Sequence, residues 1–131
     1  MSRRELREQI FKLLFRIEFN APEEMAEQEQ LFFEDICEAD GADEEYISTK
    51  YRKIAEKLET IDRMLNEKAE NWHTDRMGKV DLTILRLAVY EITYDEDVPT
   101  GVAINEAVEL AKKFGQDASS SFINGILAKF A

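Results

Sequence analysis

The sequence RMGKVDLTILRLAVYEITYDEDVPTGVAINEAVELAKKFGQDASSSFINGILAKF, residues 76–130, determines the predicted fold. It contains three helical patterns separated by turns. Apolar residues surround nearly the whole of the first pattern, for which Asp81 is the predicted N-cap and Tyr94 the end. A helix with so little polar surface is normally buried at the centre of a protein. Its β-branched residues would also suit a strand, but its length favours a helix.

Two more helices are predicted after a turn at residues 97–101. The first ends at Gly115, because glycine is common at helix C-termini. The second begins with Asp117 or Ser119 as its cap. The predicted buried positions of this pair are Ile104, Ala107, Val108, Ala111, Phe114, Phe122, Ile123, Ile126, Leu127 and Phe130.

Helical periodicity also covers the N-terminal half. The first helix ends before Pro22, which cannot continue helical hydrogen bonding. An acidic helix follows, residues 40–43 form a break, and one long helix then runs to about Trp72 with an apolar repeat close to 3.5 residues. The predicted buried residues of the first two helices are Leu6, Ile10, Leu13, Leu14, Ile17, Met25, Phe32, Phe33 and Ile36, and those of the long helix are Ile47, Tyr51, Ile54, Leu58, Ile61 and Leu65.

Composition agrees with one all-α domain over residues 1–131, either undivided or made of two packed helical subassemblies. The chain has 131 residues, 44% of them hydrophobic, with only 5 glycines and 2 prolines, which argues against a loop-rich all-β protein. Its single cysteine, Cys37, excludes an internal disulfide, fits a reducing compartment and is predicted to be a small core residue. Charges within the apolar N-terminal stretch exclude a signal peptide or a membrane span. A cytoplasmic protein is expected.

Charge is distributed unevenly along the chain. The formal net charge is −11, but residues 1–17 hold five basic and two acidic side chains, and residues 18–49 hold twelve acidic and no basic ones. A polyanion responds to the local field within a Debye length of about 8–10 Å. The first helix is therefore able to meet phosphate groups despite the total charge, and the acidic segment is most simply a solvated face.

Catalytic and metal-binding patterns are missing from the sequence. The only histidine is His73, so paired histidine ligands do not occur, and a solvated surface position is expected for it. Acidic neighbours around Cys37 would raise its pKa and so disfavour a reactive thiolate. The sequence has no nucleophile elbow and no glycine-rich phosphate loop. We expect neither an enzyme nor a cofactor or metal.

The first helix offers a nucleic-acid surface. Beside its apolar stripe lies an arc that carries, in angular order, Arg3, Arg7, Phe11, Arg4 and Phe15. Guanidinium groups pair with phosphates and aromatic rings stack on unpaired bases, which is the combination that single-stranded RNA requires. The alternative is that the two phenylalanines only widen the apolar stripe and the arginines border it.

Three strings carry a resemblance to a known family. They are KVDLTILRLAVYEI (79–92), DVPTGVAINEAVELAKKFG (97–115) and SFINGILAK (121–129), and in this order they resemble the NusB family of bacterial transcription antitermination factors. The resemblance implies two small helical bundles packed together. It also implies binding of the boxA element of ribosomal RNA leaders, jointly with the ribosomal protein NusE, in an antitermination complex on RNA polymerase.

The resemblance assigns candidate sites residue by residue. The family's arginine-rich N-terminus corresponds to Arg3, Arg4 and Arg7, and an aromatic position on that helix corresponds to Phe15. The partner-binding or structural positions are a polar pair, Asp81 and Arg86, the NEA motif at Asn105 and Glu106, and the F-[IV]-NG motif at Phe122, Asn124 and Gly125. Purely structural roles are the alternative: a carboxylate partner for Arg86, backbone bonds for Asn105 and Asn124, and close helix approach at Gly125.

Departures from the family pattern weaken the expected RNA affinity. Glu5 interrupts the arginine run, and residues 100–101 and 119–121 lack basic or aromatic side chains that many members have. Each lost phosphate contact lowers affinity, so we expect weak binding by the chain alone and stronger binding with NusE. One rival function is a protein–protein adaptor of the same fold. The other is the RNA-binding domain of a ribosomal RNA methyltransferase, which is disfavoured because these residues include no catalytic domain. Both a monomer and a homodimer remain open.

Overall fold

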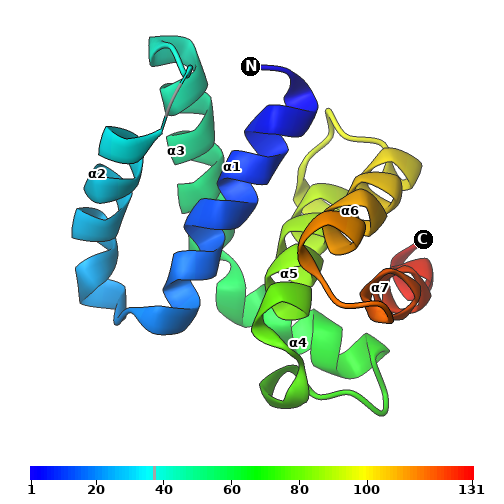
Figure 1. The fold of residues 1–131 in the computed structure, drawn as a ribbon. Helices are drawn as coiled ribbons and strands as arrows, with labels where there is room; N and C mark the ends of the chain where they lie inside the picture. Colours follow the sequence, from blue (N-terminus) through cyan, green and yellow to red (C-terminus); the bar gives the residue numbers. More distant parts are fainter. Residues whose placement is uncertain (37) are drawn as a thin grey trace. The chain divides into compact units, whose positions relative to one another are not determined.

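A computed structural model describes residues 1–36 and 38–131, so the prediction made for Cys37 lies outside the described residues. All regular structure in these residues is helical, which confirms the all-α class (Figure 1). The α-helices are α1 (Arg3–Phe15), α2 (Met25–Asp35), α3 (Gly41–Glu56), α4 (Leu58–Lys68), α5 (Lys79–Tyr94), α6 (Thr100–Phe114) and α7 (Ser119–Leu127), and the 3₁₀ turns are η1 (Arg16–Phe19), η2 (Pro22–Glu24), η3 (Thr74–Arg76) and η4 (Ala128–Phe130).

The chain divides into two compact units, Met1–Ala55 and Glu56–Ala131. This agrees with the two helical bundles expected from the family resemblance. The boundary falls at the end of α3, where the sequence predicted one continuous helix to about Trp72. That prediction is wrong: the helix stops at Glu56, Lys57 has φ −103° and ψ 5°, and α4 begins at Leu58 and ends at Lys68. The apolar repeat is buried on both sides of the break, at Ile47, Tyr51 and Ile54 of α3 and at Ile61 and Leu65 of α4.

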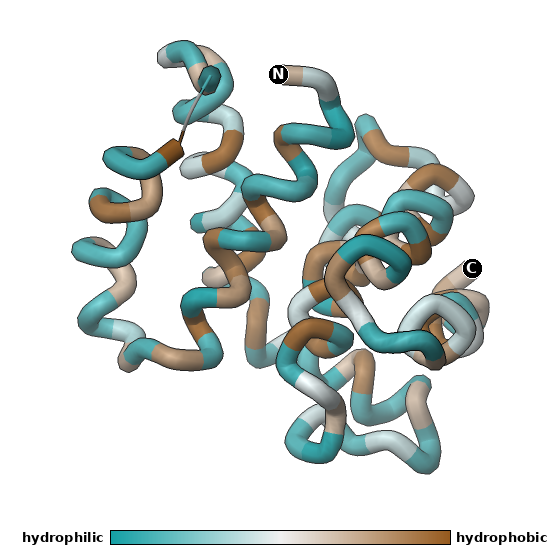
Figure 2. The backbone as a smooth tube through the Cα atoms, in the orientation of Figure 1, coloured by the Kyte–Doolittle hydropathy of each residue, from teal (hydrophilic) through white to brown (hydrophobic). Residues whose placement is uncertain are grey.

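The first unit buries one apolar face from each of its three helices. Figure 2 shows hydrophobic positions recurring along α1 with hydrophilic positions between them. Leu6, Ile17, Phe33 and Ile36, which were predicted to be buried, are only partly so. The buried apolar residues of this unit are Ile10, Phe11, Leu13, Leu14, Met25, Phe32, Ile47, Tyr51 and Ile54.

Glu29, on α2, departs from the solvated acidic face expected for residues 18–49. Only 8% of the residue is exposed. Its carboxylate accepts a hydrogen bond from the Ser48 hydroxyl and two from the Arg52 guanidinium, at 3.3 and 3.2 Å, both from α3. A buried carboxylate requires such partners, because an unpaired charge away from water is costly. Burial, with Glu29 nearby, also raises the pKa of Tyr51 above its ordinary value.

In the second unit, α5 is the central helix, as predicted, and it contacts α4, α6 and α7. Leu82, Ile84, Leu85, Leu87, Ala88 and Val89 are all buried on it. The helix begins at Lys79 after Gly78, so Asp81 lies inside the first turn and is not the N-cap. A carboxylate there still favours the helix through the macrodipole. Gly78 is the N-cap, and its carbonyl accepts a hydrogen bond from the Leu82 amide at 2.9 Å.

The α6–α7 connection shows why Gly115 is a glycine. The helix ends at Gly115, as predicted, and the φ of −91° there is available to any residue. A Cβ built on Gly115 would lie 2.6 Å from both Cβ and Oγ of Ser119 and 2.7 Å from the Ala111 carbonyl oxygen. Close approach therefore requires the glycine. The predicted caps of α7 are also wrong: Ala118 is the N-cap, and the Ser119 hydroxyl accepts from the Gln116 amide at 2.9 Å.

Candidate nucleic-acid interface

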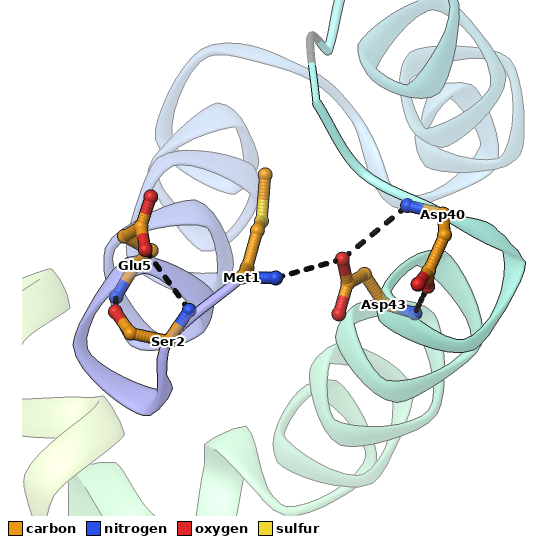
Figure 3. Close-up of polar contacts among 5 residues, drawn as sticks. All are labelled: Met1, Ser2, Glu5, Asp40 and Asp43. Atoms are coloured by element: carbon orange, nitrogen blue, oxygen red, sulfur yellow. Dashed lines mark hydrogen bonds and ion pairs between the residues drawn. The ribbon is translucent and has the colours of Figure 1, made fainter.

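The start of α1 is fixed by a reciprocal cap (Figure 3). The Ser2 hydroxyl accepts from the Glu5 amide at 3.1 Å, and the Glu5 carboxylate accepts from the Ser2 amide at 2.9 Å. The bond from the Ser2 backbone lowers the pKa of Glu5. Glu5 thus does more than interrupt the arginine run: it belongs to a capping box, and its carboxylate is held by the first turn.

The N-terminal amine ties the same end of the chain to α3. The Met1 amine donates to Asp43 Oδ2 at 3.1 Å (Figure 3). Asp43 and Asp40 form a reciprocal pair at the start of α3, in which the Asp43 amide donates to Asp40 Oδ1 at 2.8 Å. The hydrogen bond between the Met1 amine and Asp43 raises the pKa of the amine and lowers the pKa of Asp43. The break predicted at residues 40–43 is therefore a helix start that also anchors the chain terminus.

The three arginines of α1 do not share one environment. Arg3 and Arg4 are exposed, whereas Arg7 is buried with 9% of its surface accessible. The sequence predicts phosphate contacts for all three. Phe11, which the sequence placed on the arc beside the arginines, is only 3% exposed, so this ring widens the apolar stripe, as in the alternative interpretation. The exposed arginines of α1 are thus those of its first turn, and burial leaves Arg7 little surface for a ligand. Lys12, in the last turn, is also exposed and lies 3.6 Å from Glu8 Oε1.

Phenylalanine rings continue from α1 into η1. The centroids of Phe11 and Phe15 lie 6.1 Å apart with the rings stacked, and those of Phe15 and Phe19 lie 5.0 Å apart at 70°. Phe11 is buried, Phe15 is partly buried and Phe19 is 60% exposed. Phe19 is not among the predicted site residues, although its four-residue spacing from Phe15 is a signal in the sequence.

The η1 turn is held against α2 by Arg16. Its guanidinium lies 5.3 Å from the centre of the Phe32 ring. The same group donates to the backbone carbonyl and the side-chain oxygen of Gln28, both at 3.2 Å. Arg16 is thus engaged within the first unit, and η1, which ends at Phe19, is held against α2.

Arg86 of the second unit pairs with a carboxylate, which was the structural alternative to a partner-binding role. Its guanidinium donates to both oxygens of Asp62 on α4, at 2.9 and 2.8 Å. Both side chains are largely buried, with 14% and 26% exposed. Asp62 was missed because it lies 24 residues away in sequence. Two parallel charge-assisted bonds fix α5 against α4.

The remaining family-derived positions lie on the surface of the second unit. Asn105 and Asn124 are exposed, and Glu106 is partly exposed. The close helix approach considered for Gly125 is wrong, because a Cβ there would meet no described atom within 4 Å. Phe122, predicted to be inside, is partly exposed, and its ring meets that of Trp72 edge to face at 5.4 Å.

Other site types receive little support from the described residues. His73 is exposed, as predicted, with Nδ1 2.9 Å from Asp75 Oδ1. Within residues 1–36 and 38–131, no cluster of three histidine, cysteine or acidic side chains suits a metal ion. In the same residues, no helix has both the length and the apolar character needed to cross a membrane.

The chain is thus all-helical, with two exposed arginines in the first turn of α1 and a series of phenylalanine rings, Phe11, Phe15 and Phe19, that runs from α1 into η1. Comparison with known proteins makes the assignment specific. A model of the NusB family matches residues 4–131, and the chain belongs to this family. The transcription antitermination protein NusB of Agathobacter rectalis is 50% identical over 131 residues, which cover all of both chains.

Solved structures agree with the family assignment. The structure of T. maritima NusB is 38% identical, with a TM-score of 0.88 over 100% of this chain and 91% of that one. A structure of the antitermination factors NusB and NusE with double-stranded RNA matches with a TM-score of 0.82 over 98% of this chain and 94% of that one. Its identity is 24%, so this second likeness concerns the fold alone.

Proposed function

We propose that this protein is an antitermination factor that binds boxA-type single-stranded RNA of ribosomal RNA leaders together with NusE, within a complex on RNA polymerase. Family membership over nearly the whole chain supports the antitermination role. The observation that carries RNA binding is the exposed pair Arg3 and Arg4 on the same helix as the partly exposed ring of Phe15. RNA and NusE as partners come from the family resemblance. No catalytic step is part of the proposal.

The two exposed arginines supply the ionic part of binding. They lie in the first turn of α1, which the Ser2–Glu5 cap holds in place. Phosphate contacts by guanidinium groups release counterions, so binding weakens as salt rises, by about 0.7 in logarithmic slope per contact for a single strand. Phe15 supplies a ring face for a base, which stabilises by about 1–3 kcal/mol in comparable proteins.

Partner binding is assigned to the second unit. Asp81, Asn105, Glu106 and Asn124 are at least partly exposed there, so their polar groups are accessible to a protein such as NusE. Arg86 is a supporting residue in this scheme, since Asp62 engages its guanidinium. RNA and NusE would bind cooperatively if each partner orders or completes the site of the other.

One observation favours the adaptor alternative, in which the protein joins other proteins and has little RNA affinity of its own. Burial of Arg7 removes one of the three expected phosphate contacts. The alternative predicts that NusE binds with undiminished affinity while RNA binding is absent.

The test is the double variant Arg3→Ala/Arg4→Ala, with Lys53→Ala/Arg63→Ala as its control. The control removes the same charge from exposed positions on α3 and α4. Affinity for a labelled boxA-type RNA is measured by fluorescence anisotropy at several salt concentrations. We expect weaker binding by the first variant and a salt slope lower by about 1.4, with the control near wild type. Equal slopes for the wild type and the first variant would refute the site assignment.

A further inference from the structure

We propose that Phe19 extends the RNA interface as a platform on which a nucleobase stacks, so that one RNA strand runs from the first turn of α1 to η1. This inference rests on the proposed function and adds a ligand contact at its far end. Phe19 is the most exposed large apolar residue of the described chain, at 60%.

The ring is the last member of a supported aromatic series. Phe11, 3% exposed, fixes the inner end, and its ring stacks on that of Phe15. Phe15 then meets Phe19 edge to face at 5.0 Å. An isolated exposed phenylalanine is ordinary on a protein surface. A ring held by a second ring that is itself anchored in the core presents a stacking surface with less conformational entropy to lose on binding.

The chemistry of this end differs from that of the first turn. Arg16, which begins η1, is engaged by Gln28 and the Phe32 ring, so its charge serves the contact between η1 and α2. A base on Phe19 would therefore gain stacking energy without an added phosphate contact from Arg16. Stacking tolerates any base, because every base has a π face. Phe19 should thus contribute affinity with little dependence on salt, unlike Arg3 and Arg4.

The geometry also sets the length of RNA. The backbone continues in the right-handed helical region from α1 into η1, with φ −63° and ψ −23° at Arg16. With a rise of about 1.5 Å per residue in α1 and about 2.0 Å in η1, Arg4 and Phe19 lie about 25 Å apart along the chain axis. A strand whose bases keep the stacked spacing of a duplex, about 3.4 Å, spans that distance in about seven nucleotides.

The test compares Phe19→Leu with Phe19→Tyr, since leucine keeps apolar bulk and tyrosine keeps the ring. Tyr46→Leu is the control, because it removes another exposed ring, 45% accessible, from α3 of the same unit. Each variant is titrated into labelled boxA-type RNAs of about twelve and about five nucleotides, one longer and one shorter than the expected span.

We expect Phe19→Leu to weaken binding of the longer RNA at least about fivefold with an unchanged salt slope. Phe19→Tyr and Tyr46→Leu should match the wild type, and on the shorter RNA all variants should be equal. If Phe19→Leu binds the longer RNA as tightly as the wild type does, the inference is overturned and the proposed function stays intact. The same conclusion follows if Tyr46→Leu loses as much affinity for the longer RNA as Phe19→Leu does. If the wild-type protein binds neither RNA even with NusE present, the proposed function fails and this inference fails with it.

Discussion

Gly115→Ala tests the packing of the α6–α7 connection. The new Cβ would lie 2.6 Å from Ser119 Cβ and Oγ and 2.7 Å from the Ala111 carbonyl oxygen. Ser119 is only 4% exposed and Ala111 contributes backbone, so neither moves cheaply. Overpacking of this kind lowers the free energy of unfolding by about 1–3 kcal/mol. Replacing glycine by alanine also reduces the conformational entropy of the unfolded chain, which offsets about 0.4–1 kcal/mol of that loss. The expected net loss is about 1–2 kcal/mol.

For a chain of this size that loss lowers Tm by about 3–10 °C. Fluorescence of Trp72, the single tryptophan, reports the unfolding, because its ring packs on Phe122 of α7. Gly125→Ala is the matched control, since its Cβ would meet no described atom within 4 Å. Alanine is the better helix former, so this control should gain about 0.5–1 kcal/mol. A Gly115→Ala protein as stable as the wild type would refute the close-approach argument.

Two further predictions concern ion pairs. Arg86→Met removes both bonds to Asp62 and leaves that carboxylate partly buried, so the free energy of unfolding should fall by about 1–2 kcal/mol; an unchanged urea midpoint would contradict this. The Met1–Asp43 pair stabilises the fold only while both groups are charged. The pKa of the Met1 amine is raised above 8.0, so the stabilisation by the amine is lost as pH rises through the pKa of the amine in the folded protein. The pKa of Asp43 is lowered below 3.8, so the stabilisation by this carboxylate is lost as pH falls through the pKa of Asp43 in the folded protein. NMR titration should find both shifts, and Asp43→Asn should return the amine toward its ordinary pKa; an amine that titrates identically in that variant would show that the pair does not form.

Periodicity was sufficient for the helical class and for the central position of α5, because an apolar surface on nearly every side permits few other environments. It was insufficient where a break carries no local signal. The stop at Lys57 involves neither proline nor glycine, and the apolar repeat passes through it. The backbone angles at Lys57 reveal that break, and the division into two units, which depends on contacts distant in sequence, coincides with it.

Side-chain environments in the candidate interface were harder to predict than helices. The angular position of Arg7 placed it at the border of the apolar stripe, where tertiary packing alone decides between exposure and burial. The partner of Arg86 lies on another helix, so only the type of partner was predictable. The contact between Ser2 and Glu5, by contrast, was predictable from the sequence, because the two residues have the three-residue spacing of a capping box. Glu5 was instead interpreted only as a negative charge within the arginine run.

The most direct test of the central claim is fluorescence anisotropy with labelled boxA-type RNA and a scrambled RNA of equal composition, each with and without NusE. A boxA-type duplex distinguishes single-strand from double-strand recognition. We predict preferential binding of the single-stranded boxA-type RNA, strengthened by NusE. Equal and negligible binding of both single strands with NusE present would contradict the account and favour the protein adaptor.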